Sequence, residues 1–202
     1  MGGGVLNRGE LRLARLAEAY AAKTYDTRHK CFLSYHSEDA DEVADFVDAF
    51  GTAFIPKVIG ISEEDPLISS SNTDYIMDRI REKYLTDSTV TMVLMGKCTW
   101  ARRFVDWEVY SSLHRGKVNR LNGLMAVNLP SITASDVSKL PPRVDDNLPR
   151  TNGPDRFARW YQYPTTASEV QGWVDNAFDA RVNRQALIDN SRPRKINSSS
   201  CK

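Results

Sequence analysis

The apolar run TVTMVLM at residues 89–95, together with RRFVDWEV at residues 102–109, is the clearest indication of how this chain folds. The first segment is short, almost wholly apolar and rich in β-branched residues, which is typical of a strand buried on both faces. The second segment has helical spacing, because residues three and four apart share one face of a helix. The residues on its predicted inner face are Val105, Glu108, Val109 and Ser112. We therefore predict a buried strand followed by a helix that packs back onto the same sheet.

The same alternation of strand and helix extends in both directions from this pair. The predicted strands are residues 30–35, 53–61, 89–95, 124–129 and a short one at 157–163. The predicted helices are residues 39–50, 73–85, 101–114 and 167–181. Such alternation implies right-handed crossovers and a parallel sheet. The sequence thus predicts an α/β, flavodoxin-like, three-layer sandwich around a central parallel five-stranded sheet.

The two ends of the chain lie outside this alternating core. Residues 9–25 have amphipathic helical spacing and predict an extra N-terminal helix that packs on the domain or on a partner. The end of the chain is rich in Ser, Arg and Lys, which favours disorder. We therefore divide the chain into a helical extension at residues 1–29, a domain at 30–182 and a disordered tail at 183–202.

Composition argues against several classes of function. Lys and Arg total 27 against 26 for Asp and Glu, so neither a nucleic acid nor an acidic membrane is indicated as a partner. No segment approaches the roughly 18 apolar residues of a membrane span, and no apolar secretory segment begins the chain. The three cysteines and three histidines are scattered without metal-ligand spacing. We expect a cytoplasmic protein that binds no metal and no resident cofactor.

The loop after the first predicted strand, residues 34–39, is a poor phosphate cradle. It reads SYHSED, with no glycine and two carboxylates. A flavodoxin would have a loop rich in Ser, Thr and Gly here, and a dinucleotide-binding domain would have G-x-G-x-x-G. A phosphoacceptor receiver domain would have an aspartate at the end of the third strand, where this chain has Met95 and Gly96. A flavin- or nucleotide-binding protein of this fold is therefore disfavoured.

Glu108 is the carboxylate best suited to chemistry. A helix that follows a strand begins at the rim where open α/β folds bind ligands. Glu108 lies on the inner face of such a helix, flanked by Phe104 and Trp107, and a carboxylate against aromatic walls is a candidate catalytic group. The structural alternative is that Asp106 and Glu108 complement the positive end of the helix dipole.

Two parts of the chain resemble a known family. Residues 31–39, CFLSYHSED, resemble the first signature box of TIR domains. Residues 90–96 and 102–109 resemble a narrower group, the TIR-like proteins of bacterial antiphage systems, above all the small TIR component of Thoeris defence. The resemblance covers about residues 30–130. It departs at Phe104, where the family often has Trp, and the loop after the second strand lacks the Arg-Asp-x-x-Pro-Gly pattern of receptor-type TIR domains.

The resemblance implies that Glu108 is the catalytic residue of an activity that cleaves NAD+ and often cyclises the product. The product would be a cyclic or conjugated ADP-ribose signal that activates a separate effector. A phage component or self-assembly would switch the enzyme on. The residues expected to contact the substrate are Ser34, Tyr35, His36, Ser37, Asp39, Phe104 and Trp107.

These assignments have structural alternatives. Ser37 or Asp39 would cap the helix that follows, Tyr35 would pack in the core, and His36 would be a loop residue. For the whole chain, the alternative to an enzyme is a non-enzymatic TIR-like module that assembles protein partners. An acid within an aromatic pocket favours the enzyme, because a scaffold has no need of one there.

Overall fold

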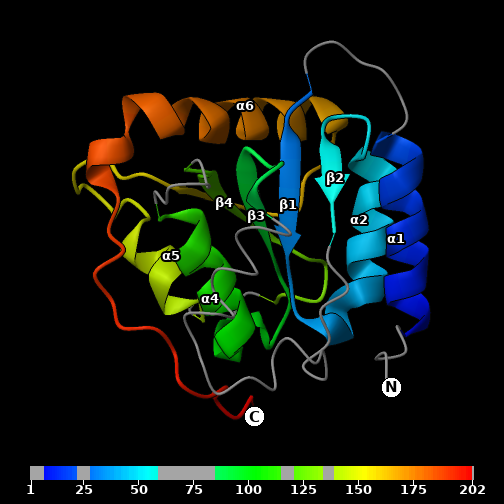
Figure 1. Ribbon diagram of the computed structural model, residues 1–202, viewed down its shortest axis with the longest axis horizontal. Helices are drawn as coiled ribbons and strands as arrows, with labels where there is room; N and C mark the ends of the chain where they lie inside the picture. Colours follow the sequence, from blue (N-terminus) through cyan, green and yellow to red (C-terminus); the bar gives the residue numbers. More distant parts are fainter. Residues whose placement is uncertain (1–6, 22–27, 59–84, 115–120, 134–138, 202) are drawn as a thin grey trace.

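A single parallel sheet of five strands lies at the centre of the structure. The computed structural model describes residues 7–21, 28–58, 85–114, 121–133 and 139–201. The strands are β1 (Lys30–Ser34), β2 (Ile55–Lys57), β3 (Val90–Met95), β4 (Gly123–Asn128) and β5 (Arg159–Tyr161). Their order across the sheet is β2-β1-β3-β4-β5 (Figure 1). This is the flavodoxin-like order, so the predicted fold class is confirmed.

The strand order places the topological switch of the sheet between β1 and β3. The chain runs from β1 outward to β2 and then returns to the other side of β1. Every residue of β3 and β4 is buried, and the two strands pair in register from Val90 with Gly123 to Met95 with Asn128. Strands that are apolar on both faces need cover on both faces, which the helices provide.

Helices pack on each side of the sheet. They are α1 (Arg8–Ala21), α2 (Ala40–Phe50), α4 (Arg103–Ser112), α5 (Pro142–Asp146) and α6 (Ala167–Asn183). Helices α2 and α6 cover one face, with α1 outside α2, and α4 and α5 cover the other (Figure 1). The close approach of α6 to β4 requires Gly123, because a Cβ at that position would overlap the carbonyl oxygen of Ala177.

The extra N-terminal helix packs on the domain. Leu13 and Ala17 of α1 are buried, and Leu13 belongs to the same core cluster as the inner face of α2. The start of α1 is capped reciprocally, since the Asn7 amide donates to the Glu10 carboxylate at 2.8 Å and the Glu10 amide donates to the Asn7 side chain at 2.9 Å. The amphipathic pattern therefore reflects packing against α2.

The C-terminal segment differs from the sequence-based expectation. Residues 183–202 were expected to be disordered, but the structure describes them through Cys201, beginning with the end of α6 and the short 3-10 helix Gln185–Leu187. Their main-chain groups bond to α4, as detailed below. Composition failed here because hydrogen bonds to a folded surface leave no periodic signal in the sequence.

The boundaries of the other described elements differ only slightly from the predicted ones, and one helix was not predicted. Helix α5 lies between the predicted strands at residues 124–129 and 157–163, where no helix was predicted. The predicted helix at residues 73–85 lies almost wholly outside the described residues, as does the end of the predicted strand at 53–61. None of the helices in the described part of the chain is both long and apolar enough to cross a membrane.

Candidate active site

The switch point brings together two predicted site residues that are far apart in the sequence. Ser34 is the last residue of β1, and its hydroxyl donates a 2.6 Å hydrogen bond to Oε2 of Glu108 on α4. Ser34 is fully buried and Glu108 is 9% exposed. Ligands of open α/β sheets bind beyond the carboxyl ends of the strands at such a point. The Ser34–Glu108 pair therefore lies where the fold places a ligand site.

The orientation of α4 turns Glu108 toward the sheet. Val105 and Val109 are buried in the core between α4 and the sheet. The Ser112 hydroxyl donates to the Glu108 carbonyl at 2.8 Å and lies 2.6 Å from the hydroxyl of Thr91 on β3. The predicted inner stripe of this helix is thus confirmed. The helix dipole has its main effect in the first turn of α4, and Glu108 lies beyond that turn.

Burial governs the protonation of Glu108. The pKa of its carboxyl is raised to about 8, first because burial removes water from the charged form, while the hydrogen bond from Ser34 acts in the opposite direction. In this arrangement the carboxyl is largely uncharged near neutral pH. A cationic group placed beside it would favour the carboxylate.

The loop after β1 is shaped by His36. Residues Ser37–Asp39 form a short 3-10 helix, and His36 Nδ1 accepts a 2.9 Å hydrogen bond from the Glu38 amide as its cap. His36 is buried, so the interpretation of this residue as a structural part of the loop is confirmed. Tyr35 packs against the core under α2, as its structural alternative predicted. Contact of either residue with a substrate stays a prediction.

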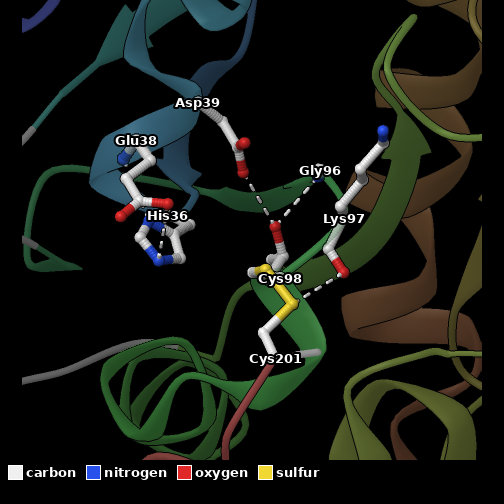
Figure 2. Close-up of a disulfide and its surroundings, with 8 residues drawn as sticks. His36, Glu38, Asp39, Gly96, Lys97, Cys98 and Cys201 are labelled. Atoms are coloured by element: carbon white, nitrogen blue, oxygen red, sulfur yellow. Dashed lines mark hydrogen bonds and ion pairs between the residues drawn. A yellow bond between two sulfur atoms is a disulfide. The ribbon is translucent and has the colours of Figure 1, made fainter.

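Asp39 is the last residue of the loop after β1, and its side chain contacts the loop after β3. It occupies the cap position of α2 without a side-chain cap bond. Its carboxylate instead accepts a 3.2 Å hydrogen bond from the Thr99 hydroxyl (Figure 2). The carboxylate also lies so close to Gly96 that a Cβ at that position would overlap it. Burial raises the pKa of Asp39 to about 6, although the Thr99 bond opposes this rise. The proposed cap role of Asp39 is therefore wrong, and Ser37 likewise provides no cap side chain.

Phe104 and Trp107, the two aromatic residues predicted to flank Glu108, form a cluster on one side of α4. Trp107 packs with Phe32 and Leu85, and Phe104 joins this cluster edge-to-face at 5.4 Å from the indole ring. The guanidinium of Arg103 lies over both rings, at 4.8 Å from Phe104 and 5.3 Å from Trp107. The indole N–H of Trp107 donates to the main-chain carbonyl of Lys195 at 2.8 Å. Direct contact of Phe104 and Trp107 with a substrate stays a prediction.

A buried ion pair behind α4 was missed from the sequence. Arg143 is wholly buried and its Nε donates to Oδ1 of Asp106 at 2.9 Å. The other oxygen of Asp106 accepts the main-chain amide of Lys195 at 2.8 Å. An acid in the first turn of a helix is a weak signal for a partner cation, but nothing in the sequence identifies Arg143 as that cation. Among the described residues, no cluster of His, Cys, Asp or Glu could hold a metal ion.

These features define a class of protein: a doubly wound α/β domain with a buried, hydroxyl-bonded carboxyl group at its switch point. A family model described as "Thoeris protein ThsB, TIR-like domain" matches residues 32–134, which include both Ser34 and Glu108. The chain belongs to this TIR-like family of Thoeris defence proteins. No curated protein matches the chain.

Proposed function

We propose that this protein cleaves the nicotinamide–ribose bond of cytoplasmic NAD+ and forms a cyclic or conjugated ADP-ribose signal for a separate defence effector. The observation that supports this most is the Ser34–Glu108 pair, buried at the β1/β3 switch point of a domain in the Thoeris TIR-like family. An acid that only stabilised the helix would gain nothing from being buried against a strand end.

Glu108 supplies charge stabilisation in this proposal. Breaking the nicotinamide–ribose bond passes through an oxocarbenium-like state, as in glycoside hydrolysis. Nicotinamide leaves with the electron pair of the bond, and positive charge develops at the anomeric carbon. A carboxylate preorganised near that carbon stabilises the charge as it forms. The hydrogen bond from Ser34 fixes the direction of the carboxyl group before the substrate arrives.

The substrate itself promotes ionisation of Glu108. The nicotinamide ring of NAD+ carries a positive charge, and a nearby opposite charge favours the carboxylate over the neutral acid. The proton of the neutral acid passes to solvent as the substrate binds. In this proposal Glu108 is largely uncharged in the empty site, because burial raises its pKa to about 8, and the positive charge of the substrate makes it a carboxylate in the occupied site.

A dry site favours cyclisation or conjugation over hydrolysis. Ser34 is fully buried and Glu108 nearly so, which keeps bulk water away from the reacting carbon. A nucleophile within the substrate, or a second bound molecule, then attacks the anomeric carbon and releases its own proton. Ser37 and Asp39 at the rim, with His36 and Tyr35 beside them, are the proposed contacts for the remainder of the dinucleotide.

Nicotinamide release tests the proposal. Purified protein is incubated with NAD+, alone and with lysate of phage-infected cells as a source of an activator, and nicotinamide is followed by chromatography. The wild-type protein should release nicotinamide and Glu108→Gln should not. If the lysate-activated wild-type protein releases no more nicotinamide than Glu108→Gln, the non-enzymatic TIR-like module becomes the better interpretation.

A further inference from the structure

We propose that Cys98 and Cys201 are a reversible thiol–disulfide site, whose oxidised form fastens the C-terminal strap onto α4 and so holds Glu108 in position. The C-terminal strap is residues 188–201. A disulfide joins the two cysteines, which are 103 positions apart in the sequence and whose Cα atoms lie 5.5 Å apart. This separation between Cα atoms is ordinary for a disulfide. The effect on activity rests on the function proposed above, whereas the effect on structure does not.

The strap is bonded along the outer side of α4 by its main chain. The Lys195 amide donates to Asp106 at 2.8 Å, and the Lys195 carbonyl accepts the indole N–H of Trp107 at 2.8 Å. The Ser199 amide donates to the Ala101 carbonyl at 2.8 Å. These bonds reach the turn before α4 and two residues of α4, of which Trp107 directly precedes Glu108 in the sequence.

Little apolar burial holds this part of the strap. Ile196 is the one large aliphatic residue in the sequence from 191 to 201, and it is 80% exposed. Hydrogen bonds that replace bonds to water contribute modestly. The near end of the strap is anchored where Arg143 donates to the Asn190 side chain and the Pro193 carbonyl. The far end is held by hydrogen bonds of Lys195, Ser198 and Ser199 to residues 100–103, and the disulfide is its one covalent attachment.

The disulfide also lies beside the predicted substrate loop. Cys98 precedes Thr99, whose hydroxyl donates to Asp39 and accepts the Gly96 amide (Figure 2). The loop from β3 to α4 is therefore held from one side by Asp39 and from the other by Cys201. Reduction removes the second of these attachments and leaves the start of α4 less constrained.

A small disulfide can oxidise the Cys98 and Cys201 thiols, and a small thiol can reduce their disulfide. Oxidation joins the two sulfur atoms as two thiol protons and two electrons pass to a small disulfide, which becomes two thiols. A dithiol reductant reverses the step. Cys98 and Cys201 are both partly exposed and therefore open to thiol exchange, whereas Cys31 is fully buried in β1. Cys31 thus provides an internal control.

Hydrogen–deuterium exchange with mass spectrometry tests the strap directly. The full chain is compared after treatment with oxidised glutathione or with dithiothreitol, beside Cys201→Ser and the control Cys31→Ala. Alkylation of the native protein confirms the redox state, with two more thiols labelled after reduction. We expect reduction to raise exchange at residues 99–108 at least threefold in the wild-type protein and in Cys31→Ala. Cys201→Ser should show the raised exchange under both conditions.

The same samples are assayed for nicotinamide release. The reduced wild-type protein and Cys201→Ser should have kcat lowered at least threefold with little change in KM, because α4 rather than the substrate contacts is loosened. Equal exchange at residues 99–108 in the oxidised and reduced wild-type protein would overturn the proposal, whatever the activity. Changed exchange with unchanged kcat would overturn its link to Glu108. Absence of nicotinamide release in every sample would count against the proposed function alone, since the exchange result stands by itself.

Discussion

Glu108 has two properties that one physical cause explains. Its burial makes the charged form costly and raises the pKa of the carboxyl to about 8, and the same burial provides the dry environment in which a carboxylate acts strongly on a developing positive charge. Ser34 is the hydroxyl that directs the group and partly offsets the rise in pKa.

Activity should rise with pH. The carboxylate is the form that stabilises the transition state, so kcat/KM follows deprotonation of the free enzyme. We expect kcat/KM to increase from pH 6 and to level off above an apparent pKa of about 8, the value to which burial raises the Glu108 carboxyl. Steady-state nicotinamide release across pH 6–9 provides the measurement. A profile that falls over this range would contradict the role of the carboxylate.

The free energy of unfolding should also depend on pH through Glu108. The folded-state pKa of about 8 lies above the ordinary value of 4.5, so the folded protein holds this proton more tightly than the unfolded chain. The associated stability is fully present below pH 4.5 and is lost as pH rises toward 8. Glu108→Gln cannot ionise and escapes this loss. We expect the free energy of unfolding of Glu108→Gln, relative to that of wild type, to be roughly 1–3 kcal/mol higher at pH 8 than at pH 5.

Urea unfolding at pH 5 and pH 8 measures that difference. Asp39, whose pKa is also raised, to about 6, contributes equally to both proteins and cancels in the comparison. A constant difference between wild type and Glu108→Gln across this range would show that the Glu108 pKa is not raised in the folded state.

At the scale of elements, α4 is fixed on the sheet side by apolar packing and on the outer side by charge. Val105 and Val109 enter the core, while Asp106 meets Arg143 and the strap. Only the first of these attachments is visible as helical spacing in the sequence. The second joins residues 37 apart through a short helix in a polar connection, which no local pattern encodes.

Removing Arg143 should be strongly destabilising. Arg143→Met would leave Asp106 buried without its cation, and such a loss costs about 3–5 kcal/mol. Arg150→Met is the matched control, since Arg150 pairs with Asp145 at 2.8 Å on the surface, where solvent screens the pair. Urea unfolding compares the two variants. Equal losses would show that the Arg143–Asp106 pair contributes no more than a surface ion pair.

Features that depend on local sequence patterns were predictable, whereas features that depend on contacts between distant residues were not. β3, β4 and the inner face of α4 were predictable, because continuous apolar runs and helical spacing are local consequences of burial. Glu108 and Ser34 were both predicted as site residues, and their roles stay predictions; the hydrogen bond between them was not predicted. The positions of Trp107 and Asp39 could not be foreseen. They depend on the strap and on Thr99, which only the folded chain brings near.

At the scale of the whole molecule, the Cys98–Cys201 disulfide closes the chain from just before α4 to the C-terminal strap into one loop. It links positions 103 apart, and three scattered cysteines gave no sign of the pairing. Cross-linking a loop of this length limits the unfolded chain and is worth about 4–5 kcal/mol in the chain-entropy account. The loop contains Glu108 and most of the β3–α4 connection, whereas Ser34 and Asp39 lie outside it.

Reduction should therefore lower global stability as well as free the strap. We expect dithiothreitol to shift the urea midpoint of wild type downward, to the midpoint of Cys201→Ser, and to leave Cys201→Ser itself unchanged. Cys31→Ala should respond to the reductant as wild type does. A midpoint of the wild-type protein that is insensitive to dithiothreitol would contradict a stabilising disulfide.

The central claim is that Glu108 acts as a carboxylate on the ribose of NAD+. Its most direct test is the release of nicotinamide by wild type and by Glu108→Gln, matched for folding by urea unfolding and assayed with the same activating lysate. We predict nicotinamide and an equal amount of a cyclic or conjugated ADP-ribose from wild type. Glu108→Gln should be at least a hundredfold slower, in the range expected for loss of one electrostatic group. Equal rates for the two proteins would contradict the account.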